Sequence, residues 1–141
     1  MYTAILLSAL MSLAIIVFHY GALRTITSVS RKFSSHFAMS ITVVSFLFLL
    51  HLIEIAWYAA HIYAAYEYIG IMGFSQNFVP VAQDYFHIAA SGYTTLGAFS
   101  NSPIDNLAIL VDLTSLTGFM MLTWSATYYY NIFSNSHTPN G

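Results

Sequence analysis

The chain has 141 residues, of which 58% are hydrophobic and only 6% are charged, and its formal net charge is −2. Soluble domains carry about 25% charged residues, so this composition excludes a water-soluble globular protein and indicates one compact integral membrane domain. The three basic residues are too few for the basic surface that nucleic-acid binding requires. Because cysteine is absent, disulfide bonds and thiolate metal sites are excluded as well.

Three segments are long enough to cross a bilayer, which takes about 20 apolar residues. The first, at about Tyr2–Leu23, lacks the basic start and the cleavage site of a signal peptide and is predicted to be a retained transmembrane helix. The second, Phe37–Tyr66, is long enough to tilt, and the third is Asn106–Phe133. The polar tail Ser134–Gly141 is predicted to be disordered.

The basic residues predict the orientation of the chain. Arg24, Arg31 and Lys32 all lie between the first and second predicted spans. Cytoplasmic connections carry the excess of Lys and Arg, so the N-terminus is expected outside and the C-terminus in the cytoplasm.

The segment Gly70–Pro103, between the second and third spans, carries the most informative pattern. Val81–Tyr93 is apolar but too short to cross the bilayer, and it runs into a series of small and polar residues at Ser91–Phe99. Non-helical backbone occurs at membrane depth only where it is buried in protein or lines water, and cation filters use such carbonyl oxygens to replace the hydration shell of an ion. The segment therefore predicts a re-entrant helix and a pore loop; a plain extracellular turn is the alternative.

The predicted constriction, which we call the filter-like segment, consists of Thr94, Thr95, Leu96, Gly97, Ala98 and Phe99. The C-terminal end of the preceding short helix carries roughly half a negative charge, which favours a cation. Thr94 to Gly97 are expected to follow in extended form, and Gly92 and Gly97 to provide the backbone freedom that such a filter demands.

Three motifs follow one another over about half of the chain: His-Leu-Ile-Glu at 51–54, Tyr-Thr-Thr-Leu-Gly at 93–97, and Asp112–Gly118 followed by Trp-Ser-Ala at 124–126. In this order they resemble the pore module of small prokaryotic two-pore-type ion channels of the potassium-channel superfamily. The resemblance implies a homotetramer with four loops around one axis, in a prokaryotic cytoplasmic membrane. It also implies a monovalent cation as the permeant ion and no bound cofactor.

The chain departs from that family at the end of the filter. The family has Tyr-Gly-Asp where this chain has Ala98, Phe99 and Ser100. Phenylalanine in place of glycine resists positive φ, so potassium-filter geometry and potassium selectivity are not expected. A weakly selective cation path, another permeant species and a pore fold that does not conduct are the alternatives.

His51 and Glu54 stand three residues apart on one helical face, near the middle of the second span. Ionisable groups at that depth face the protein interior and pair, so they are expected to support the filter, with Glu54 accepting hydrogen bonds from the back of the pore loop. The alternative is a metal site that uses His51, Glu54 and either His87 or His61, although no HExxH motif is present.

Asp84 and Asp112 are also predicted to support the filter. Asp84, three residues before His87, would draw cations toward the mouth; a solvated surface pair is the alternative. Asp112 lies in the third span and must pair or face water. Gly118 in the same span is expected to allow close helix packing or to serve as a bending point beside an inner cavity.

The sequence thus predicts an all-α membrane protein with three transmembrane helices plus a re-entrant pore helix and filter-like loop. Its expected units are an N-terminal helix and basic loop (1–36), a pore module (37–133) and a cytoplasmic tail (134–141). The expected function is passive cation transport by a homotetramer in lipid, not enzymatic catalysis. The alternatives are an accessory subunit bound to other membrane subunits, and a membrane metal-binding protein.

Overall fold

The computed structural model describes residues 1–71, 73–74 and 78–134, and every regular element in that part of the chain is helical. The helices are α1 (Tyr2–Ser30), α2 (His36–Glu67), α3 (Ala82–Tyr93) and α4 (Asp105–Ser134). The predicted all-α class is confirmed. Helices α1, α2 and α4 are long and apolar enough to cross a membrane, which agrees with the predicted integral membrane location. All of the predicted tail except Ser134 lies outside the described residues.

The helix boundaries agree with the sequence prediction within one residue, except at the end of α1. That helix continues past the predicted Leu23 to Ser30, because no proline or glycine interrupts the segment after Gly21. A short connection follows, and α2 begins where the Ser35 hydroxyl accepts a hydrogen bond from the Ala38 N–H at 3.4 Å, as an N-cap residue does.

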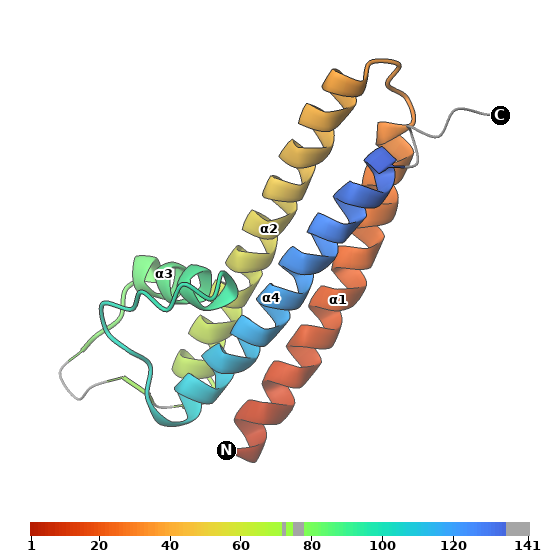
Figure 1. Cartoon of the computed structure of the whole chain (residues 1–141). Coiled ribbons are helices and arrows are strands. Elements are labelled where there is room, and N and C mark those ends of the chain that lie inside the picture. Colours follow the sequence, from red (N-terminus) through yellow and green to blue (C-terminus); the bar gives the residue numbers. More distant parts are fainter. Residues whose placement is uncertain (72, 75–77, 135–141) are drawn as a thin grey trace.

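The three long helices form a bundle in which the chain runs along α1, back along α2 and forward again along α4 (Figure 1). Helix α1 packs against α4 and α2, whereas α3 packs against α2 and α4. Figure 1 shows α3 lying across the bundle, on the side of α2 that faces away from α1. The short helix is therefore positioned by α2 and α4 together.

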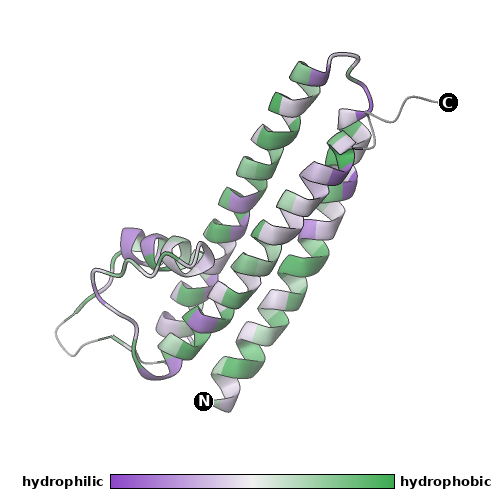
Figure 2. Ribbon diagram, viewed as in Figure 1, coloured by the Kyte–Doolittle hydropathy of each residue, from purple (hydrophilic) through white to green (hydrophobic). Residues whose placement is uncertain are grey.

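The outer surface of the bundle is apolar. Large side chains such as Leu6, Val17 and Phe48 are more than half exposed, and Figure 2 shows hydrophobic residues along much of α1 and α2, interrupted by a few polar turns. Contiguous apolar surface of this extent is not found on water-soluble monomers. Lipid or further protein must cover it.

Candidate functional site

A polar cluster lies inside the bundle, around the fully buried side chain of Glu54. Its carboxylate oxygen Oε1 is 2.8 Å from Nδ1 of His19 in α1, and Oε2 is 3.2 Å from Nδ1 of His51 in α2. The hydroxyl of Tyr93, the last residue of α3, donates a hydrogen bond to Oε2. Three helices therefore meet at one carboxylate.

Two further contacts complete this cluster. Nδ1 of His51 lies 2.8 Å from the Tyr93 hydroxyl oxygen, and Nε2 of His19 lies 3.3 Å from the hydroxyl oxygen of Ser125 in α4. We call His19, His51, Glu54, Tyr93 and Ser125 the central polar cluster. Since its members come from all four helices, the cluster ties the end of α3 to the three long helices.

The sequence pattern identified His51 and Glu54 but missed His19, which the fold brings to the same carboxylate. The signal was present: His19 is an ionisable residue within a long apolar segment, and such residues normally face the protein interior. His19, His51 and Glu54 each offer one metal-ligand atom, and these atoms lie within 4.8 Å of one another. His87 and His61, the other two metal candidates, do not belong to this group.

The chain reverses direction directly after the cluster. Residues Thr94 to Ala98, which we call the 94–98 loop, are exposed and run back beside α3. The loop is held at Ala98, whose carbonyl oxygen lies 2.7 Å from Nε2 of His87 and accepts a bond from the Ser91 hydroxyl at 3.2 Å. The Gly97 N–H donates to the Ser91 carbonyl at 3.1 Å. The backbone of the loop is thus fastened to α3 by two side chains and one carbonyl group of that helix.

The backbone of the 94–98 loop is unusual in two respects. Thr95 and Gly97 adopt left-handed conformations, with φ values of 58° and 66°, and the backbone of Thr94 is in the helical region, so the expected extended form is wrong. Gly92 lies inside α3 without a positive φ. Within the part of the chain that the structure describes, the carbonyl oxygens of Thr95 and Leu96 accept no hydrogen bond. Two backbone acceptors of this exposed loop therefore have no donor within the described part of the chain.

The remaining predicted site residues lie in α3, in α4 and directly after the loop. Phe99 is partly buried and packs against the apolar core, and its φ is not positive. Asp84 accepts a hydrogen bond from the Val81 N–H at 2.8 Å and so caps the start of α3. Asp112 is exposed on α4. Gly118 of α4 is buried against the backbone of Tyr93, a close helix approach of the kind that small residues permit.

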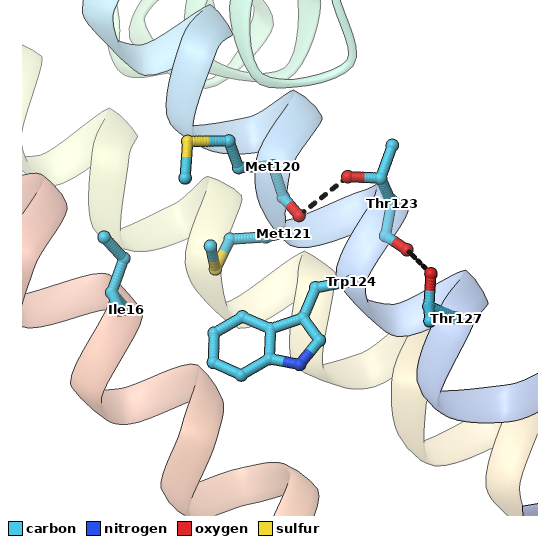
Figure 3. A pocket seen from close by; sticks show the side chains of 6 residues that line it. All are labelled: Ile16, Met120, Met121, Thr123, Trp124 and Thr127. Atoms are coloured by element: carbon cyan, nitrogen blue, oxygen red, sulfur yellow. Dashed lines mark hydrogen bonds between the residues drawn. The ribbon is translucent and has the colours of Figure 1, made fainter. Parts of the chain in front are cut away.

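An open groove of about 400 Å³ lies beside the central polar cluster, between α1 and α4. Figure 3 shows its lining side chains, which are Ile16, Met120, Met121, Thr123, Trp124 and Thr127. The two threonine hydroxyls donate to carbonyl oxygens of their own helix, and the Trp124 ring lies 5.4 Å from the His19 ring. Because both threonine hydroxyls already donate within α4, the surface of the groove is mainly apolar.

The geometry of the site thus consists of a buried histidine–carboxylate–tyrosine cluster and an exposed loop that begins at the same tyrosine. The cluster can hold a proton or a cation, and the loop can offer carbonyl oxygens to a ligand. No protein-family model, no curated protein and no solved structure matches this chain.

Proposed function

We propose that the chain is a subunit of a pore-loop cation channel, in which four copies place their 94–98 loops around one axis. The observation that carries the proposal is the course of the chain at Tyr93. Helix α3 ends there with a buried side chain, and the next five residues are exposed. In this proposal α3 is the re-entrant pore helix and α4 lines the inner cavity.

The depth of Tyr93 supports this assignment. Tyr93 binds Glu54, which precedes the end of α2 at Glu67 by 13 residues. At 1.5 Å per residue, Glu54 is about 20 Å from that end of the helix, so a hydrocarbon core about 30 Å thick that began near Glu67 would contain the start of the loop. Helix α3, with 12 residues, spans only about 18 Å. Exposed backbone at this depth must meet protein or water rather than lipid.

The chemistry of the loop favours a cation. The C-terminal end of α3 contributes a partial negative charge, and the free carbonyl oxygens of Thr95 and Leu96 are groups of the kind that replace water around a permeating cation. Lys and Arg occur only at Arg24, Arg31 and Lys32, which belong to the other end of the bundle, where α1 connects to α2 (Figure 1). The positive charges of these three side chains therefore do not repel a cation at the loop.

Selectivity for potassium is not part of the proposal. Phe99 packs toward the core and lacks the left-handed backbone of Gly97. We therefore propose carbonyl rings formed by Thr95 and Leu96, without an upper ring at Phe99, which suits a weakly selective cation path. The Thr94 and Gly97 carbonyl oxygens already accept the Thr95 hydroxyl and the Phe99 N–H.

A non-conducting accessory subunit is the competing function, because another membrane protein could cover the same loop. The decisive measurements are the oligomeric state by native mass spectrometry and cation flux into liposomes that contain the purified chain. Because the sequence has no cysteine, single-cysteine variants are clean reporters. A membrane-impermeant cationic thiol reagent should block flux through Thr95→Cys.

The matched control is Val17→Cys, on the exposed outer face of α1, where the reagent should leave the flux unchanged. A tetramer with flux that is blocked only at Thr95→Cys supports the channel. A monomer without flux, or equal block at both cysteines, would exclude the proposed pore.

A further inference from the structure

We infer that His19, His51 and Glu54 bind one divalent transition-metal ion of the zinc class inside the bundle. The site would join α1 to α2 directly behind the 94–98 loop. The inference does not depend on conduction, since it concerns only the central polar cluster and is tested by metal content.

The donor set and its spacing fit such an ion. Two imidazoles and one carboxylate form a common set for Zn²⁺ and Fe²⁺. Zinc takes these ligands at about 2.0–2.2 Å in a tetrahedral arrangement, which separates two ligand atoms by about 3.3 Å. Nδ1 of His19 and Nδ1 of His51 lie 2.8 and 3.2 Å from the Glu54 oxygens. These two oxygens are different, and one ligand atom of each of the three residues lies within 4.8 Å of the others, so side-chain shifts of up to about 1.5 Å would bring the three atoms to the separation that the ion requires.

The charge balance of the cluster also favours a cation. Glu54 and His19 have no exposed surface, and burying a carboxylate is costly unless an opposite charge compensates it. All three Lys and Arg side chains are exposed and lie beyond residue 23 of α1 or in the connection that follows it. The described neighbours of Glu54 are imidazoles and a phenol. The compensating positive charge must therefore come from a protonated imidazole or from a bound cation, and a divalent ion would supply it.

The surrounding contacts match those that orient metal ligands. A metal-bound imidazole usually donates its second ring N–H to a nearby acceptor, and Nε2 of His19 lies 3.3 Å from the Ser125 hydroxyl oxygen. A bound carboxylate is usually hydrogen-bonded as well, and Glu54 accepts from Tyr93. Imidazole and carboxylate ligands select zinc, iron, cobalt or nickel over the soft cuprous ion, which prefers thiolates.

The test uses the full chain in detergent, stripped with a chelator and titrated with Co²⁺ as a spectroscopic probe. The wild type should bind one ion per chain and develop the visible absorption of tetrahedral cobalt, and Zn²⁺ should abolish that absorption. His19→Ala, His51→Ala and Glu54→Gln should each lose the spectrum. His87→Ala, a histidine outside the cluster, should retain it, and Tyr93→Phe should retain it with an affinity lowered about 10–100-fold.

Circular dichroism measures the helical content of each protein alongside its titration. If an alanine variant unfolds, the near-isosteric Glu54→Gln variant decides whether the cluster binds the metal. A folded wild type that takes up no Co²⁺ at stoichiometric excess would overturn the inference in favour of a purely hydrogen-bonded cluster. Retention of the wild-type spectrum by folded Glu54→Gln would overturn it too.

Discussion

Gly118 in α4 and Tyr93 at the end of α3 are in backbone contact: a Cβ atom built on Gly118 would overlap the carbonyl group of Tyr93. The same tyrosine donates its hydroxyl hydrogen to Glu54 in α2. Tyr93 is therefore held by its backbone on one side and by its side chain on the other. The position of the 94–98 loop, which starts at the next residue, depends on both contacts.

Replacing Gly118 with alanine should push α3 away from α4. Overpacking of this kind costs about 1–3 kcal/mol, and we expect a loss of that size in the free energy of unfolding, measured by denaturant titration in mixed micelles. The control is Gly21→Ala in α1, where nothing lies within 4 Å of the added methyl group. That change should be neutral or stabilising by up to about 1 kcal/mol. Equal effects of the two substitutions would contradict the close approach at Tyr93.

Gly97→Ala should destabilise the 94–98 loop, because Gly97 has a φ of 66°. Left-handed backbone costs a residue with a Cβ atom about 1–2 kcal/mol. Thr95→Gly should have the opposite effect, since Thr95 is β-branched and its φ is 58°. Amide hydrogen exchange of the loop should be faster in Gly97→Ala and slower in Thr95→Gly. Unchanged exchange in both variants would show that the loop does not hold these dihedral angles.

His87→Ala should loosen the loop at Ala98 while the two hydrogen bonds to Ser91 and the bundle remain. The substitution removes the ring nitrogen that lies 2.7 Å from the Ala98 carbonyl oxygen, and a hydrogen bond of this type contributes about 0.5–1.5 kcal/mol. Limited proteolysis or hydrogen exchange between residues 96 and 100 should report the loosening. Gln83→Ala, at an exposed position of the same helix, should leave the protection of the loop as in the wild type.

The stability of the α2–α3 contact should fall in alkaline solution. The Tyr85 hydroxyl donates to Oε1 of Glu67 at 2.9 Å; burial, followed by that hydrogen bond and the carboxylate charge, raises the pKa of the Tyr85 phenol well above its ordinary value. A group whose pKa is raised in the folded state stabilises it below the unfolded pKa, and this contribution is lost as the pH rises above about 10.

Unfolding measured from about pH 8 to pH 12 should therefore show a decline in stability in the wild type. The decline should be smaller in Tyr85→Phe, which has no phenol to ionise. Identical pH profiles for the two proteins would mean that the Tyr85–Glu67 contact does not contribute to stability.

Much of the fold could be predicted from the sequence, because long apolar segments are detectable without any tertiary information. α2, α3 and α4 start and end within one residue of the expected positions. The one clear error in a helix boundary is at the end of α1. It arose because the number of apolar residues needed to cross the bilayer was taken as the length of the helix. A helix can continue into the polar region as long as no residue breaks it, and α1 does so as far as Ser30.

Only part of the site could be predicted from the sequence. The spacing of His51 and Glu54 indicated an interior pair, because residues three apart share a helix face. The same rule could not identify their partner His19, which lies 35 positions before Glu54. His87 illustrates the converse limitation: it belongs to a residue type that suits the proposed metal, but α3 directs it to Ala98 rather than to Glu54.

The sequence by itself determined that this chain is helical, with three helices long and apolar enough to cross a membrane and a short helix between the second and third, since hydrophobic length and periodicity are local properties. Only the tertiary structure decided that His19, His51, Glu54 and Tyr93 meet around one carboxylate. It alone decided, too, that the loop after Tyr93 turns back along α3 with exposed carbonyl oxygens. Contacts between distant residues depend on how helices pack, and packing is a property of surfaces that no single segment contains.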